Sequence, residues 1–153
     1  MEIRKAVPED LEALFAERLE FIMDMRNHEV DIPEDFKKNT YEFMKEHMAD
    51  DTLVTWIAEE GGVIISTVMV SYYQILPVMS NPSGKTGYVL NVFTKPEYRR
   101  QGITTRLLNM MVEDARERKV GKLYLTASDM GKPVYEKFGF EILTKDMVYK
   151  ISE

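Results

Sequence analysis

The residues whose types and spacing could support chemistry lie between positions 92 and 108. There an apolar, β-branched run ends at a proline, passes through a short basic loop, turns at Gly102 and enters an amphipathic helix. The first turn of a helix leaves backbone N–H groups unpaired beside the positive end of the helix dipole, so this layout favours a phosphate. Arg99, Arg100 and Arg106 add positive charge around the same point, in a chain whose net charge is −6. The pattern predicts a site for an anionic ligand.

A comparison with known phosphate-binding loops indicates which kind of anion this segment would bind. The segment lacks the Gly-Lys-Ser/Thr ending of a P-loop and the three glycines of a dinucleotide-binding turn. Its order of strand, Pro-Glu-Tyr-Arg-Arg-Gln-Gly-Ile and helix resembles the acyl-CoA signature Arg/Gln-x-x-Gly-x-Gly/Ala of the GNAT superfamily of N-acetyltransferases. Arg99 and Gly102 fit this signature, whereas Thr104 stands where the family has Gly or Ala. An ordinary strand-to-helix connection with solvated arginines is the alternative interpretation.

A second segment, residues 134–140, resembles another signature of the same superfamily. Its sequence Val-Tyr-Glu-Lys-Phe-Gly-Phe is similar to Leu-Tyr-x-x-x-Gly-Phe and follows the loop at the expected distance. The resemblance implies that Tyr135 is the catalytic residue, a phenol that protonates the CoA thiolate as it leaves the tetrahedral intermediate. The alternative is that Tyr135 is only a packed aromatic beside Phe138 and Phe140.

The resemblance also implies where acetyl-CoA, the acyl donor, would lie. Its pantetheine arm would pair with free backbone groups at the end of the strand before the loop, as an added strand does. Its pyrophosphate would lie over the loop and the first helical turn, and Ser128 would face the cofactor unless it caps the following helix. The implied cofactor-binding residues are Val92, Phe93, Thr94, Arg99, Arg100, Gln101, Gly102, Ile103, Thr104, Thr105, Ser128 and Tyr135.

The general base that would take a proton from an attacking amine has no clear signature. The strand over residues 88–94 contains no carboxylate, so the simplest internal base is missing. Groups on or just after the first helix could reach the acceptor pocket, and tyrosines could act through water. The acids could equally lie on a solvated face and the histidine in a surface loop. The candidates left open are Glu20, Asp24, His28, Glu29, Tyr72 and Tyr88.

Hydrophobic periodicity predicts the elements that would position these residues. Strands are expected at residues 3–6, 52–58, 63–73, 88–94 and 123–126, with Glu60-Gly61-Gly62 as a hairpin turn. Helices are expected from Pro8, from Pro33, over residues 103–118 and around Tyr135, and one or two strands over residues 141–150. This order resembles the GNAT fold. The resemblance implies one α/β (α+β) domain over residues 1–153, with a mixed, twisted sheet of six to seven strands, splayed between its fourth and fifth strands and flanked by about four helices.

Composition excludes several classes of function. Without cysteine the chain can form no disulfide, thiol nucleophile or cysteine-based metal site, and its two histidines, His28 and His47, lie far apart, so we expect no metal. The acidic balance argues against nucleic acid, which requires a broad basic face. No apolar run approaches the roughly 20 residues that span a membrane, and the amino terminus lacks the apolar core of a signal peptide. We therefore expect no membrane association and a cytoplasmic location.

These observations predict an N-acetyltransferase. It would transfer the acetyl group of acetyl-CoA to a primary amine of a small molecule or peptide, by direct attack within a ternary complex. Acidic residues in the first two helices favour a cationic amine or a basic peptide end as the partner. Two alternatives are a non-catalytic acyl-CoA-binding sensor and a partner-binding protein without a ligand. The sequence also leaves a homodimer open.

Overall fold

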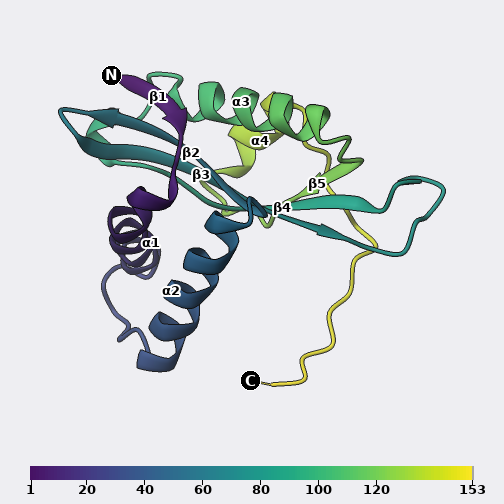
Figure 1. The fold of residues 1–153 in the computed structure, drawn as a ribbon, viewed down its shortest axis with the longest axis horizontal. Helices are drawn as coiled ribbons and strands as arrows, with labels where there is room; N and C mark the ends of the chain where they lie inside the picture. Colours follow the sequence, from purple (N-terminus) through teal and green to yellow (C-terminus); the bar gives the residue numbers. More distant parts are fainter. Residues whose placement is uncertain (153) are drawn as a thin grey trace.

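In the computed structural model, which describes residues 1–152, helices cover both faces of a central β-sheet (Figure 1). The strands are β1 (Glu2–Lys5), β2 (Leu53–Glu60), β3 (Val63–Gln74), β4 (Lys85–Thr94) and β5 (Lys122–Tyr124). The helices are α1 (Leu11–Met25), α2 (Glu34–Ala49), α3 (Ile103–Glu117) and α4 (Lys132–Phe138), with short 3-10 turns at Pro8–Asp10 and Pro96–Tyr98. Through α4, the elements follow the order that periodicity predicts.

The sheet has the order β1-β2-β3-β4-β5, and only the β4–β5 pair is parallel. β2 and β3 are joined by the expected two-glycine turn, in which Gly61 and Gly62 have φ angles of 57° and 77°. A two-residue turn of this hand requires positive φ at both positions, which glycine adopts without a side-chain clash. The sequence therefore sets the register of this hairpin through its turn.

Each face of the sheet carries its own hydrophobic core. α1 and α2 lie on one face, and α3 and α4 lie on the other (Figure 1). On α3, buried apolar residues recur at helical spacing and turn one side of the helix to the sheet. The cluster under α3 contains Val54, Ala58, Ile65, Val68, Val70, Val89, Ile103, Leu107, Leu108 and Met111. The cluster under α1 and α2 contains Leu14, Met44, Leu53, Ile57 and Met69.

β4 and β5 separate soon after they meet. Their pairing covers Thr86–Lys122, Gly87–Leu123 and Tyr88–Tyr124 and then ends. Gly87 permits the close approach, because a Cβ there would lie 2.6 Å from the Leu123 side chain. Beyond this point, residues 89–94 of β4 have no strand on their outer side among the described residues. The expected splay between the fourth and fifth strands is confirmed.

The expected count of six to seven strands is wrong, because the described residues form five. Residues 141–150 contain neither helix nor strand, and β5 ends at Tyr124 rather than at Thr126. The apolar side chains of this C-terminal segment lie in solvent, with Met147 97% and Tyr149 87% exposed. Strand propensity reflects packing against neighbouring strands. These residues have no such neighbour, and so their β-branched and aromatic composition does not produce a strand.

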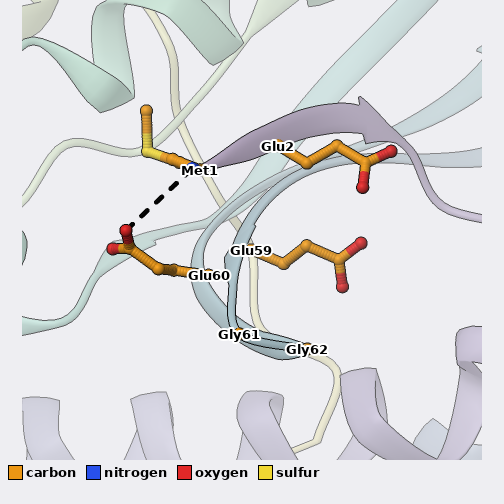
Figure 2. A pocket seen from close by; sticks show the side chains of 6 residues that line it. All are labelled: Met1, Glu2, Glu59, Glu60, Gly61 and Gly62. Carbon is orange, nitrogen blue, oxygen red and sulfur yellow. Dashed lines mark ion pairs between the residues drawn. The ribbon is translucent and has the colours of Figure 1, made fainter.

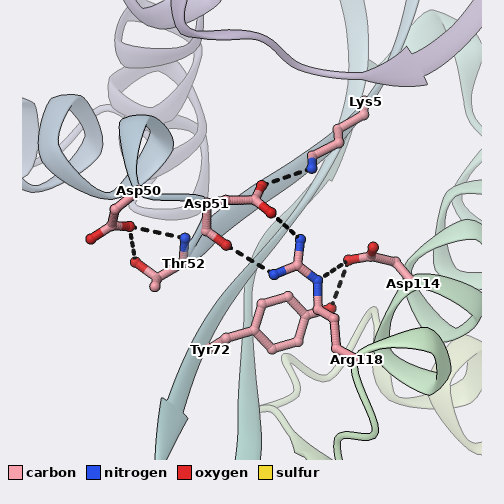
Figure 3. Close-up of polar contacts among 7 residues, drawn as sticks. All are labelled: Lys5, Asp50, Asp51, Thr52, Tyr72, Asp114 and Arg118. Carbon is pink, nitrogen blue, oxygen red and sulfur yellow. Dashed lines mark hydrogen bonds and ion pairs between the residues drawn. The ribbon is translucent and has the colours of Figure 1, made fainter.

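Arg118, which directly follows α3, connects this helix to β3 and to the turn between α2 and β2 (Figure 3). Its Nε donates to Asp114 Oδ2 at 2.8 Å, and its Nη1 and Nη2 donate to the backbone and the carboxylate of Asp51 at 2.9 and 2.7 Å. Its guanidinium also lies 4.6 Å from the centre of the Tyr72 ring on β3. Lys5, at the end of β1, donates to the other oxygen of Asp51 at 2.7 Å. Only the planar guanidinium fork can make this set of contacts.

The Arg118→Ala variant should therefore be less stable than the parent by about 1–3 kcal/mol, because it loses three charge-assisted hydrogen bonds and a cation–π contact. Urea unfolding measures this difference. Arg116→Ala is the matched control: Arg116 is 71% exposed and, among residues 1–152, pairs only with Glu113, so its loss should cost less than about 0.5 kcal/mol. Equal losses in the two variants would contradict the role of Arg118.

Candidate active site

The loop between β4 and α3 presents a row of unpaired backbone N–H groups. After the 3-10 turn Pro96–Tyr98, the backbone is left-handed at Arg100, with φ 61°, and again at Gly102, with φ 76°. Within the described chain, the N–H groups of residues 100–105 donate to no protein oxygen. They lie at the positive end of a 15-residue helix. Unpaired N–H groups in this setting form a binding site for an anion.

Arg99 holds this loop against the strand and against α1. Its Nε donates to the carbonyl oxygen of Thr94 at 2.9 Å, and its Nη2 lies 3.6 Å from Asp24 Oδ2 on α1. The guanidinium also lies 6.0 Å from the centre of the Phe93 ring. Arg99 therefore fixes the shape of the loop, while the side chain of Arg100 is exposed and supplies positive charge at its surface.

Thr104, the departure from the family signature, joins a chain of three hydroxyl groups. Its Oγ1 lies 2.8 Å from Thr94 Oγ1, which in turn lies 2.7 Å from the buried Ser66 Oγ on β3. This chain connects the first turn of α3 to the end of β4 and to the neighbouring strand. A glycine or alanine at position 104 could not make this connection. Thr104 therefore fills a position that glycine or alanine would leave open, and it adds a polar contact to β4.

Tyr135 lies on α4 with its ring against the core under α3. The ring makes an edge contact with Phe140 at 5.8 Å between centroids, and a Cβ on residue 131 would lie 2.9 Å from the ring, so Gly131 makes room for it. Among the described residues, the hydroxyl of Tyr135 has no hydrogen-bond partner. Burial raises the pKa of this phenol above its usual value, which keeps it protonated at neutral pH. Tyr135 is thus both packed, as the alternative interpretation required, and able to donate a proton.

Ser128 and Tyr88 border the gap between β4 and the segment after β5. Ser128 Oγ accepts from the N–H of Gly131 at 3.1 Å and so supports the turn that leads into α4. Tyr88, at the last paired position of β4, reaches across the gap, and its hydroxyl lies 2.6 Å from Thr126 Oγ1. The contact between the Tyr88 and Thr126 hydroxyl groups therefore marks the point where the gap begins. Beyond it, the free edge of β4 runs towards the N-terminus of α3.

Comparison with known proteins decides the family. The sequence profile of the acetyltransferase (GNAT) family matches residues 19–140, which is most of the chain. The chain belongs to this family.

Three solved acetyltransferase structures resemble the protein over nearly its whole length. A predicted acetyltransferase with acetyl-CoA from Clostridium acetobutylicum is 32% identical, over 98% of this chain and 96% of that one, with a TM-score of 0.90. A GCN5-related N-acetyltransferase from Ralstonia eutropha is 27% identical, over 98% and 97%, with a TM-score of 0.84. An aminoglycoside N-acetyltransferase in complex with CoA shares the fold at 19% identity, over 97% and 93%, with a TM-score of 0.73. No curated protein matches the sequence.

The open candidates for a general base make no hydrogen bond to β4 or are already bonded. Glu20, Asp24, His28 and Glu29 are exposed, and in the part of the chain that the structure describes none of them hydrogen-bonds to the strand. Tyr72 donates to Asp114 Oδ2 at 3.1 Å within the Arg118 cluster, where burial and that carboxylate raise its pKa. The geometry of this GNAT protein therefore singles out no base among these candidates.

Sequence reasoning missed Glu17, a buried carboxyl group on α1. Glu17 is 6% exposed and hydrogen-bonds to Asn91 and Thr67 on the face of the sheet that α1 covers. Burial raises its pKa to about 7. Two signals pointed to it: Glu17 follows the apolar Leu14 by three positions on one helix face, and a polar asparagine interrupts the apolar run of β4.

The GNAT chain also has a pocket away from the loop between β4 and α3. A shallow pocket at the β2–β3 turn is lined by Glu2, Glu59 and Glu60, with the Met1 ammonium group 3.9 Å from Glu60 (Figure 2). Its carboxylates would repel a phosphate. Across residues 1–152, no group of acidic, histidine or cysteine side chains is placed to hold a metal ion. Over the same residues, no helix has the length and apolar character to cross a bilayer.

The hydroxyl chain predicts how substitutions at Thr104 behave. Thr104→Val keeps the shape and removes the hydroxyl, which should lower the free energy of unfolding by about 1 kcal/mol, because the buried Thr94 loses one of its hydroxyl partners. Thr104→Ser keeps the hydroxyl and should stay close to the parent. Thr105→Val on the exposed side of the same turn is the control, and thermal unfolding compares all three. The same loss at Thr105 and Thr104 would show that the hydroxyl contact contributes nothing.

Proposed function

We propose that the protein transfers the acetyl group of acetyl-CoA to a primary amine by direct attack within a ternary complex. The observation that carries this proposal is the meeting of two groups of unpaired backbone: the free outer edge of β4 and the N–H groups of residues 100–105. The edge of β4 suits an extended amide-containing arm, and the N–H groups of the loop suit a pyrophosphate. CoA contains both, joined in a single molecule.

The donor would lie along this continuous surface. We propose that the pantetheine amides pair with backbone groups of Val92, Phe93 and Thr94, as a strand added to the sheet would. The pyrophosphate would accept hydrogen bonds from the N–H groups of the loop, beside the exposed charge of Arg100. The Clostridium acetobutylicum structure, at 32% identity, contains acetyl-CoA in the same fold, which supports this assignment. The donor-binding set is then Val92, Phe93, Thr94, Arg100, Gln101, Gly102, Ile103, Thr104 and Thr105, with Arg99 shaping the loop and Ser128 at the border of the gap.

In the proposed reaction, the amine nitrogen attacks the thioester carbonyl carbon and forms a tetrahedral intermediate. The C–S bond then breaks, the Tyr135 hydroxyl gives its proton to the departing thiolate, and the nitrogen loses a proton to solvent or to a base. The products are an N-acetylated amine and the free CoA thiol. Because the chain has no cysteine, no acyl-thioester on the protein precedes the attack.

The acceptor is proposed to be a cationic small molecule or a basic peptide end. Glu20 and Asp24 are exposed carboxyl groups on α1, and the exposed Glu29 follows the end of this helix. Arg99 connects α1 to the donor loop through Asp24. Such charges attract ammonium groups. A panel of polyamines, aminosugars and peptides, assayed for CoA release with a thiol reagent, tests this proposal without background from protein thiols. Donor binding without release to any amine would favour the sensor, and no donor binding would favour the partner-binding protein.

Gly102→Val should weaken acetyl-CoA binding at least tenfold, because a β-branched residue resists the left-handed backbone and moves the loop N–H groups. Calorimetric titration measures this change. Binding of S-acetylpantetheine, which lacks the pyrophosphate, should stay unchanged.

The matched control is Gly62→Val in the distant hairpin, where φ is 77° and, as at Gly102, the space around a Cβ is open. It should lose similar stability and keep donor affinity. Unchanged acetyl-CoA affinity in Gly102→Val would remove the basis of the proposed donor site.

Tyr135→Phe keeps the packed ring and removes only the acid. Acetyl-CoA affinity should stay within about twofold of the parent while turnover falls by about 100-fold, where departure of the thiolate limits the rate. Steady-state kinetics with an accepted amine separates the two quantities. Tyr41→Phe, whose hydroxyl contacts Glu12 on the helical layer, is the control and should turn over normally. Parental turnover in Tyr135→Phe would contradict the catalytic role.

A further inference from the structure

Glu17 lies in a polar network beneath β4, outside the residues that the proposed reaction uses. Its Oε2 accepts from Asn91 Nδ2 at 2.8 Å, and its Oε1 lies 3.2 Å from Thr67 Oγ1 on β3. Asn91 Nδ2 also donates to Thr67 Oγ1 at 3.0 Å, and Asn91 Oδ1 accepts from Arg18 Nη1 at 3.0 Å. Glu17 and Arg18, which are consecutive residues of α1, therefore hydrogen-bond to the two ends of the Asn91 side-chain amide. That amide belongs to the strand with the free edge.

Asn91 forms a bulge in β4. Pairing with β3 moves from Met69↔Leu90 to Thr67↔Phe93, so that two residues of β4 face the single residue Val68. Asn91 has a left-handed backbone with φ 52°, a conformation that asparagine tolerates better than most residues. Its carbonyl oxygen accepts from Thr67 Oγ1 at 2.9 Å. A bulge changes the direction in which the following residues present their backbone, and here those residues are 92–94.

A count of hydrogens shows which form of Glu17 completes this network. Thr67 has one hydroxyl hydrogen but lies near two acceptors, the Asn91 carbonyl and Glu17 Oε1. If Glu17 is ionised, the hydrogen can go to the carboxylate, and the bulge carbonyl loses its donor. If Glu17 is neutral, its own O–H donates to Thr67, and Thr67 donates to Asn91. All of these groups are then satisfied together.

The electrostatic surroundings agree with a neutral Glu17. Burial raises its pKa to about 7, and the nearby Glu20 raises it further, while Asn91, Thr67 and Arg18 act in the opposite direction. Asn91 and Thr67, which face it from the sheet, carry no charge. Within the described residues Arg18 bonds to Asn91 rather than to Glu17.

We propose that Glu17 is a positioning residue for acetyl transfer, which in its neutral form holds the Asn91 bulge and so sets where the free edge of β4 places the thioester. This role rests on the proposed function. Both carboxyl oxygens are buried and bonded to protein groups, so Glu17 acts through Asn91 rather than on the substrate. The loop at α3 would still hold the pyrophosphate without it. Loss of Glu17 therefore affects the rate of transfer more than the affinity for the donor.

Two variants at position 17 separate this role from simple support of the fold. Glu17→Gln imitates the neutral acid, because its amide can accept from Asn91 and donate to Thr67 at every pH. Glu17→Met fills the space without either bond. We expect Glu17→Met to lose at least about tenfold in kcat while its acetyl-CoA Kd stays within about twofold. Glu17→Gln should match the parent at low pH.

The pH dependence provides a readout that a structural role alone would not change. The ratio of parent to Glu17→Gln rates should fall as pH rises through about 7, the value to which burial raises the Glu17 pKa. Ionisation of the amine substrate affects both proteins equally and cancels in this ratio. The control places Glu20→Gln in both proteins, so that any effect on the acceptor cancels: the ratio of Glu20→Gln to Glu17→Gln/Glu20→Gln rates should show the same fall at lower pH, because the Glu20 charge raises the Glu17 pKa.

A second readout does not require an acceptor. The carbonyl resonance of bound ¹³C-acetyl-CoA should shift with pH near 7 in the parent, stay constant in Glu17→Gln, and differ from both in Glu17→Met. Parental kcat in Glu17→Met, or a rate ratio and resonance that do not depend on pH, would overturn the role of Glu17 alone. A parent protein that neither binds nor turns over acetyl-CoA would overturn the proposed function, and this inference with it.

Discussion

β4 and β5 run parallel but pair over only three positions, and the separation that follows governs the rest of the architecture. Parallel strands need a crossover, and here α3 supplies it, beginning where β4 ends and packing over the sheet. The start of the helix therefore lies beside the end of a strand that has no neighbour on its outer side. Unpaired strand backbone and unpaired helix backbone meet at one place. Arg99 and the Ser66–Thr94–Thr104 hydroxyl chain both hold the loop that joins them.

The two faces of the sheet contribute differently to the region where β4 ends and α3 begins. The face under α3 is an apolar core, and it supports the loop and the ring of Tyr135. The face under α1 contains the polar network of Glu17, Thr67 and Asn91, where a buried carboxyl group would be costly without partners. Its groups satisfy one another and fix a backbone conformation that the strand would not adopt alone. Apolar packing supports the strand from one side, and hydrogen bonding shapes it from the other.

Sequence patterns predicted those parts of the structure that depend on residues close together in the chain. The Gly61-Gly62 turn, the stripe on α3 and the left-handed Gly102 depend on residues a few positions apart, and all three were predictable. The C-terminal strands were not, because a strand requires a neighbour and the sequence does not state whether residues 141–150 have one. Glu17 was missed for a similar reason: its partner Asn91 lies 74 positions away, and an acid on a helix is ordinarily solvated.

The free edge of β4 also bears on how the protein behaves at high concentration. Rows of unpaired N–H and C=O groups are templates for pairing with other chains, and proteins keep such edges short or charged. The two ends of this sheet follow that rule, because β1 is only four residues long with three charged side chains and β5 is only three residues long. The free outer edge of β4 over residues 89–94 does not, since it is longer and mostly apolar. A ligand lying along it would occupy the groups through which two molecules could otherwise aggregate, and would in that way couple ligand occupancy to colloidal stability.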